Sequence, residues 1–400
     1  MKSKIFHPIV LKFCFLGALD RFMLIYSVYL IFFAKIGLSP ALIGIALSVY
    51  EIGKICGNPV SATLADKYGR KILISIGFIF KATGVGLWAF MPSVQSAFIG
   101  VLLIGIGQSG TSNIDSYMYD EFKANSLERY FKSAIAMKSI VTNMSASVGG
   151  YVTSLLYSNF GFSGVFTTSA MLMILVSIPY VIFCLQDSKL YTIDNKNKSL
   201  MYVAKNGFLE IKNDRIMFYA ILLVSMFFSA YIMYTDTNKM IMNDIGFTPD
   251  VIAKIYAVAH ITPIFTTLIF LIFRPGLLIR GVIVIAMIIW IAIAVTSYMF
   301  YGKPLVAVIL VFLFMYPIFE TCIKDNMHRL ISKSSLRSTI VSFSYLLSST
   351  LNIFFSLFIG FIAHHYSYKV AIIAFSFTIS ALIFTVMLIQ RIKVMKRLFC

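Results

Sequence analysis

Long apolar runs alternate with short polar links along the whole chain. Each run approaches or exceeds the roughly 20 residues with which an α-helix crosses a bilayer. The pattern predicts an all-α membrane protein with twelve transmembrane helices. The runs fall at residues 8–34, 41–64, 72–91, 96–119, 134–157, 164–186, 215–241, 250–273, 281–300, 304–323, 338–361 and 369–390.

One link, residues 187–214, is much longer than the others and is the one sizeable polar segment. It follows the sixth run and therefore divides the helices into two sets of six. We expect a six-helix bundle at 1–186, a cytoplasmic linker at 187–214, and a second six-helix bundle at 215–400. The second part of the linker could form a short helix on the membrane surface.

Composition supports a membrane protein and argues against an enzyme. The chain is 59% hydrophobic and 12% charged, whereas a soluble domain is about half apolar and about a quarter charged. Its five cysteines form no C-x-x-C pair, so neither a disulfide framework nor a zinc site is indicated. No phosphate-binding loop or hydrolase motif occurs in the sequence. We expect no catalytic residue, no metal and no cofactor.

The formal net charge of +18 follows the membrane topology. Lys and Arg gather in alternate links, as they do in the cytoplasmic loops of membrane proteins. This bias places both termini of an integral membrane protein in the cytoplasm. It also removes nucleic acid as the reason for the charge. With this orientation the exterior links hold only Lys35, Lys239, Lys303 and Lys369.

The link between the second and third runs is unusually charged and reads "ATLADKYGRK", residues 62–71. Gly69 permits the sharp turn that a short link needs. Asp66 lies at a helix end, where a carboxylate can satisfy orphan backbone donors. Arg70 can form a bidentate pair with a carboxylate, and Asp120 at the end of the fourth run is a candidate partner.

This link and the six-plus-six arrangement resemble the major facilitator superfamily, whose loop pattern is G-x-L-A-D-R-x-G-R-K. Ala62 stands in place of the first glycine and Lys67 in place of the arginine. The resemblance implies a latch that holds the cytoplasmic side closed in the outward-open state. Alternatively, the basic residues serve only as topology signals. The matching residues are Leu64, Ala65, Asp66, Gly69, Arg70 and Lys71, and the candidate cytoplasmic gate is Asp66, Gly69, Arg70, Lys71 and Asp120.

Charged residues also lie inside the predicted spans. Asp20 and Arg21 are adjacent in the first run, and a charge at a helix centre costs about 2.5–3.5 kcal/mol. A function is therefore the default hypothesis, the alternative being a local pair that fixes a helix contact. Lys81 is alone in the third run and needs a carboxylate, which either Asp20 or Glu51 could supply.

The fourth run carries a polar stripe whose spacing predicts one helical face. In the superfamily, helices one, four, seven and ten line a central cavity, and the resemblance places the stripe there. The stripe consists of Gln108, Thr111, Ser112, Asp115 and Tyr119. The candidate substrate and proton pathway is Asp20, Arg21, Glu51, Lys81, Gln108, Ser112, Asp115, Asp236, Tyr316 and Glu320.

A proton carrier needs a carboxylate that water can reach from both sides in turn. Asp115 is the best candidate because its whole face is polar. Asp236 is the second, because no basic residue is expected on its own helix face. Asp20 and Glu320 are weaker candidates, since Arg21 and Lys324 beside them favour the ionised form.

A further polar face lies on the fifth run, where Lys138, Thr142, Ser145 and Gly149 align. Drug/proton antiporters of the superfamily carry G-x-x-x-G-P-x-x-G-G in this helix. Here residues 141–150 read "VTNMSASVGG" and keep only the last two glycines. This difference weakens the prediction of export.

We expect a secondary active transporter that moves a small molecule by alternating access and is coupled to protons. The fourth run contains "SGTSNIDSYMYDEF", which resembles the fourth helix of bacterial efflux-type members of the superfamily, and this resemblance implies export from a bacterial cytoplasmic membrane. The partners of the transporter would be the substrate, protons and membrane lipids, and it would act as a monomer. One alternative is proton-coupled uptake of a polar solute such as a sugar or amino acid. The other is a membrane sensor or assembly factor without transport.

Overall fold

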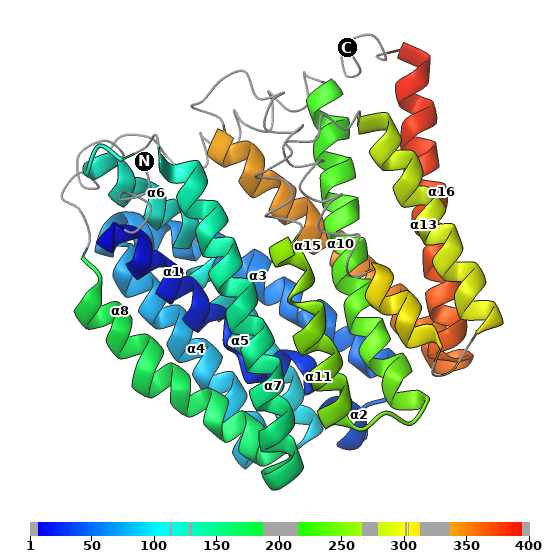
Figure 1. The fold of residues 1–400 in the computed structure, drawn as a ribbon, viewed down its shortest axis with the longest axis horizontal. Coiled ribbons are helices and arrows are strands. Elements are labelled where there is room, and N and C mark those ends of the chain that lie inside the picture. Colours follow the sequence, from blue (N-terminus) through cyan, green and yellow to red (C-terminus); the bar gives the residue numbers. More distant parts are fainter. Residues whose placement is uncertain are drawn as a thin grey trace. The chain divides into compact units, whose positions relative to one another are not determined.

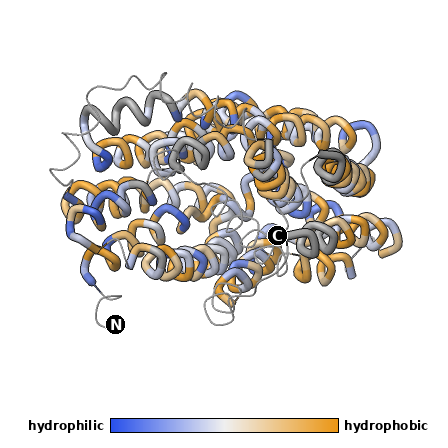
Figure 2. Tube along the Cα trace, turned by 90° about the horizontal axis from the view of Figure 1, so that it is seen from above, coloured by the Kyte–Doolittle hydropathy of each residue, from blue (hydrophilic) through white to orange (hydrophobic). Residues whose placement is uncertain are grey.

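A computed structural model describes residues 7–112, 114–127, 130–186, 215–265, 279–300, 302, 304–312 and 337–393. Every regular element in these ranges is helical. Seven of the described helices are long and apolar enough to cross a membrane. Figure 2 shows that hydrophobic residues predominate along these helices. The all-α membrane fold is confirmed, whereas the predicted linker lies outside the described residues.

The chain separates into two compact units. Unit 1 comprises Met1–Leu38, Val49–Asn197 and Phe247–Leu268, and unit 2 comprises Ser39–Ser48, Lys198–Gly246 and Ile269–Cys400. One long helix therefore contributes to both units, with its first residues in unit 2 and the remainder in unit 1. The division into bundles at 1–186 and 215–400 stays a prediction.

Unit 1 contains most of the helices that carry the candidate site (Figure 1). Its elements are α1 (Pro8–Arg21), the 3₁₀-helix η2 (Leu24–Ser27), α2 (Tyr29–Lys35), most of α3 (Pro40–Tyr68), α4 (Arg70–Phe90), α5 (Val94–Thr111), α6 (Ile114–Ala124), α7 (Phe131–Leu172), the π-helix η4 (Met173–Ser177), α8 (Ile178–Cys184) and α11 (Pro249–Ala259).

The first apolar run is not one continuous helix, and this part of the prediction is wrong. α1 ends at Arg21, and Met23 has the extended backbone angles φ −78° and ψ 108°. The chain then forms η2 before α2 begins at Tyr29. The break therefore comes directly after the two adjacent charged residues of this run.

α7 supports the break through hydroxyl groups. Ser145 donates to the carbonyl of Ala18 at 2.8 Å, and Thr153 donates to the carbonyl of Leu24 at 2.9 Å. The carbonyl of Ala18 also accepts from the N–H of Phe22, whereas that of Leu24 lies in the interrupted segment, where lipid offers no partner. The polar face predicted on the fifth run thus packs against α1 and its interruption.

The fourth apolar run is described in two helical elements, and the continuous polar face expected on it stays a prediction. α5 ends at Thr111 and α6 begins at Ile114. The fifth and sixth runs form two helices that meet at a kink within α7, at the non-helical Gly161 with φ 63°. A positive φ suits glycine because it has no side chain to clash with the backbone.

Glycines bring α4 and α5 close together. A Cβ atom on Gly84 would lie 2.7 Å from the carbonyl oxygen of Gly100, and one on Gly77 would lie 2.7 Å from that of Gly107. Small residues at such crossings let helix backbones approach within the membrane. The close approach places residues of α4 beside the end of α5.

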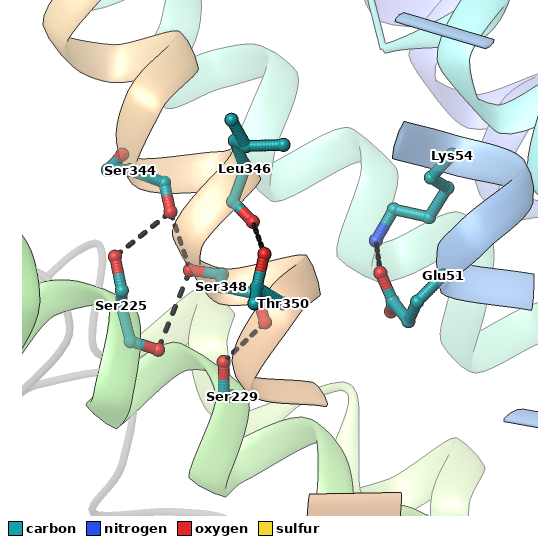
Figure 3. Close-up of polar contacts among 8 residues, drawn as sticks. All are labelled: Glu51, Lys54, Ser225, Ser229, Ser344, Leu346, Ser348 and Thr350. Atoms are coloured by element: carbon teal, nitrogen blue, oxygen red, sulfur yellow. Dashed lines mark hydrogen bonds and ion pairs between the residues drawn. The ribbon is translucent and has the colours of Figure 1, made fainter. Parts of the chain in front are cut away.

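Unit 2 contains the first residues of α3 together with α10 (Arg215–Asp244), α13 (Ile279–Met299), α15 (Arg337–His365) and α16 (Tyr368–Lys393). Serines join α10 to α15: Ser225 and Ser229 each donate at 2.9 Å, to the carbonyls of Ser344 and Ser348 respectively (Figure 3). Side-chain bonds between helices are a common device in membranes, where burial of apolar area drives association weakly.

α3 and α15 meet in a second close crossing within unit 2. The hydroxyl oxygens of Ser48 and Ser356 are 2.8 Å apart. One turn away on each helix, a Cβ atom on Gly44 would lie 3.1 Å from the Cα of Gly360. This contact lies near the start of α3 and the end of α15, which the predicted topology places on the exterior side.

Candidate functional site

Asp20 supplies the carboxylate that Lys81 needs. The Nζ of Lys81 lies 2.7 Å from Oδ1 of Asp20 and 2.7 Å from Oγ1 of Thr111. The Lys81 side chain is 0% exposed, and that of Asp20 is 16% exposed. α1, α4 and α5 therefore meet at one buried ion pair, and the question left open by the sequence is answered in favour of Asp20.

Glu51 pairs locally. Its Oε2 lies 2.7 Å from the Nζ of Lys54, three residues along α3 (Figure 3). The Lys54 side chain is 21% exposed, and its Nζ stands 5.3 Å from the centre of the Tyr50 ring. Both charges are thus compensated within one face of α3.

Asp115 forms an ion pair with Lys138, between α6 and α7. Asp115 lies in the first turn of α6, where the helix dipole favours a negative charge. Its side chain is 61% exposed, whereas that of Lys138 is 14% exposed. The carboxylate is accessible to water and at the same time holds a cation on the neighbouring helix.

Asp236 has a basic partner on its own helix, so the expectation that it had none is wrong. The Nζ of Lys239 lies 2.6 Å from its Oδ1. Residues three apart face the same side of an α-helix, which makes this pair local to α10. Asp236 consequently loses the advantage that made it the second candidate for a proton carrier.

Of the remaining pathway candidates, three lie in the described part of the chain. Gln108 is half-buried on α5, and Ser112 is exposed just beyond the end of that helix. Arg21 is exposed at the end of α1. Tyr316 and Glu320 lie outside the described residues.

The candidate gate contains an ion pair. The Nε of Arg70, the first residue of α4, lies 2.9 Å from Oδ2 of Asp120 on α6. Gly69 has φ 92° and is the single residue between α3 and α4, so this position favours glycine. Lys71 is half-buried in the first turn of α4. The Asp66 side chain lies outside the described residues.

Sequence reasoning did not identify two ion-pair partners, Lys138 and Lys239. Lys239 stands three residues after Asp236, a spacing that already predicts a pair. Lys138 shares a polar face with Ser145. This face indicated that Lys138 has a buried neighbour, but it did not identify the carboxylate. The pairing with Asp115 depends on the packing of α6 against α7, which no local spacing encodes.

Long apolar helices that hold ion-paired charges within their length define a polytopic α-helical membrane protein. The family model of the Major Facilitator Superfamily matches residues 13–348, and the chain belongs to that superfamily.

Solved structures share this fold at low sequence identity. The nucleoside transporter NupG is 16% identical with a TM-score of 0.72, and the similarity covers 97% of this chain and 100% of that one. The D-xylose-proton symporter is 13% identical with a TM-score of 0.68, covering 93% of this chain and 96% of that one. The POT family transporter PepTSo is 14% identical with a TM-score of 0.72, covering 96% and 97%.

Among curated proteins, the tetracycline resistance protein, class H, of Pasteurella multocida is similar over a short stretch. It is 30% identical over 88 residues, which are 22% of this chain and 22% of that protein. The chain therefore matches about a fifth of the length of this relative.

Proposed function

We propose that the protein is a proton-coupled exporter of a small molecule that works by alternating access. Membership of the superfamily supports secondary transport, which is not an enzymatic activity. The name of the tetracycline resistance relative favours export. The protein would act as a monomer in a bacterial cytoplasmic membrane, with both termini in the cytoplasm.

The observation that carries proton coupling is that Asp115 is 61% exposed and pairs with Lys138 on another helix, α7, whereas Asp236 is 12% exposed and pairs within its own helix. In this conformation the ammonium group of Lys138 compensates the charge of Asp115 and joins α7 to α6. Protonation would neutralise Asp115 and release Lys138. Binding of a proton and pairing of α6 with α7 would then be mutually exclusive, which is the relation that coupling requires.

Asp115→Asn is expected to abolish proton-driven accumulation and to leave downhill exchange. Asparagine cannot carry a proton, but it keeps the size and polarity of the site. The measurement is substrate-dependent proton flux in proteoliposomes across a panel of compounds. Drug sensitivity of cells that express each variant provides a second measure.

The matched control is Asp250→Asn, because Asp250 also lies in the first turn of a helix of unit 1, α11. This control should keep gradient-driven transport with an unchanged pH profile. If Asp115→Asn kept both properties as well, Asp115 would not be the proton carrier.

We propose that Arg70 and Asp120 belong to a cytoplasmic gate together with Asp66, Gly69 and Lys71. Arg70→Ala should reduce transport by about tenfold or more without lowering protein abundance, since a hydrogen bond to a charged group contributes about 1.5–3 kcal/mol. Arg70→Lys should also fail, because lysine lacks the planar guanidinium group. Flux and membrane abundance of each variant are the measurements.

A double-mutant cycle provides the control for the gate. If the two side chains act through each other, adding Asp120→Asn to Arg70→Ala should cost little further activity. Fully additive losses, or wild-type flux in Arg70→Ala, would remove the pair from the gate.

Uptake of a polar solute is the second candidate, and the charges around Asp20 favour it. A polar solute needs polar partners, and Asp20, Arg21 and Lys81 offer both signs of charge. Right-side-out and everted vesicles distinguish the two directions. The absence of flux from either would favour a membrane sensor or assembly factor.

A further inference from the structure

The side chain of Lys138 lies against Gly17 of α1 before it reaches Asp115. A Cβ atom on Gly17 would lie 2.9 Å from Cε and 3.3 Å from Cγ of Lys138, and 2.7 Å from Cγ2 of Thr142. The ammonium group at the end of the same lysine forms the ion pair with Asp115 on α6. Lys138 on α7 therefore reaches the carboxylate through the space that a missing side chain leaves on α1.

The contact between α7 and the first apolar run continues beyond Gly17. Ser145 donates to the carbonyl of Ala18 at 2.8 Å, and Thr153 donates to the carbonyl of Leu24 at 2.9 Å. These bonds do not involve the ion pair, so they fix the register of α7 against α1 independently of it. The space beside Gly17 is thus set by the packing of the two helices.

A side chain at residue 17 would displace Lys138 before it displaced the helices. Carbon atoms make favourable contacts at about 3.5–4.0 Å, so the distances beside Gly17 leave no room for a methyl group. Thr142 is β-branched and therefore stiff, and its hydroxyl donates to the carbonyl of Ser139 at 2.9 Å. Lys138 has a flexible four-carbon stem, so it is the neighbour that can yield. Its side chain is only 14% exposed, and a displaced stem would carry the ammonium group away from Asp115.

We propose that Gly17 is a positioning residue for proton coupling, because the absence of a side chain at this point lets Lys138 lie against α1 and meet Asp115. This inference rests on the proposed function, in which Asp115 carries the proton, and it adds α1 to that site. α1 also carries Asp20, three residues further on, whose partner is Lys81. One short helix thus contacts two of the ion pairs that join helices in unit 1.

The first measurement follows the position of Lys138 and needs no substrate. Lysine side chains of the purified full chain are methylated with formaldehyde and cyanoborohydride, and the rate at residue 138 is measured by peptide mass spectrometry. Gly17→Ala should raise this rate by about twofold to fivefold, the range expected when a partly exposed ion pair is lost. Asp115→Asn removes the partner of Lys138 and should raise the rate as well, which provides the reference.

Two controls separate the placement of Lys138 from general loosening of the fold. Gly86→Ala on α4 should methylate as the wild type does, because a Cβ atom there would meet nothing within 4 Å. Lys12, an exposed residue of α1, should react at the same rate in every variant. If Gly17→Ala does not fold, its combination with Thr142→Ser removes the contact with Cγ2 and keeps the contact with Lys138, so the same measurement applies.

The second measurement is transport in proteoliposomes, with tetracycline and the compounds that give proton flux with the wild type as probes. Gly17→Ala should lower proton-driven accumulation and leave downhill exchange and membrane abundance unchanged, whereas a packing defect would lower all three. Adding Lys138→Ala to Gly17→Ala should cost little further accumulation, since the glycine acts through the lysine.

Unchanged methylation of residue 138 in folded Gly17→Ala would overturn the inference, and so would an equal rise at Lys12 or in Gly86→Ala. Joint loss of accumulation, exchange and abundance would also overturn it, because that result indicates packing alone. Faster methylation of residue 138 with wild-type accumulation would confirm that Gly17 places Lys138 and would contradict the proposed coupling through Asp115. The two proposals can therefore fail separately.

Discussion

Asp20→Asn is expected to lower the free energy of unfolding by about 3–5 kcal/mol, the usual cost of breaking a buried ion pair. The substitution keeps an amide oxygen and the Thr111 hydroxyl beside Lys81, but it removes the negative charge that compensates this fully buried ammonium group. Because that group cannot reach water, its desolvation is no longer offset. Thermal unfolding of the purified variant and its abundance in membranes provide the measurement.

A second substitution separates the charge from the shape of the site. Adding Lys81→Met removes the unpaired charge and should restore much of the lost stability, since an apolar side chain of similar length tolerates burial. The matched control is Glu51→Gln, whose partner Lys54 is 21% exposed and can reach water. Asp20→Asn with the stability of Glu51→Gln would contradict the account of a buried pair.

The helical membrane fold could be predicted because each apolar run is long enough to form a helix that satisfies its own backbone. The loop pattern around Gly69 indicated the family for a similar reason, since the turn requires a glycine and the charges are local. The candidate partner of Arg70 was also correct. Its position followed from helix length alone, because the end of the fourth run must return to the cytoplasmic side.

The interruption after Arg21 could not be predicted from the apolar pattern. Residues 22–28 are as hydrophobic as a helix requires, and the break is stabilised from α7 by Ser145 and Thr153. These are tertiary contacts between segments more than a hundred residues apart.

The ion-pair partners of the charged residues also fall into two groups, those that local spacing predicts and those that depend on helix packing. Lys54 and Lys239 follow their carboxylates by three residues, so local spacing is enough to predict both pairs. Lys81 and Lys138 reach carboxylates on other helices. For Lys81 the sequence reduced the choice to Asp20 or Glu51, and only packing could decide between them.

A disulfide between residues 48 and 356 is expected to arrest the transport cycle. The hydroxyl oxygens of Ser48 and Ser356 are 2.8 Å apart, and the glycine crossing beside them holds α3 close to α15. We propose that this contact closes the exterior end and must open once in each cycle. A covalent link at this point should therefore block access from the exterior.

Site-specific thiol labelling tests alternating access most directly, and it requires no knowledge of the substrate. Ser48→Cys, Ser356→Cys and Ser112→Cys are combined in a chain whose native cysteines are replaced, namely Cys14, Cys56, Cys184, Cys322 and Cys400. Membrane-impermeant reagents are applied from each side, and modification of residue 112 is measured by mass spectrometry.

Before oxidation, we predict labelling of residue 112 from both sides. After oxidation, labelling from the exterior should fall to background, labelling from the cytoplasm should persist, and a reductant should restore both. Unchanged exterior labelling with a complete disulfide would contradict the account.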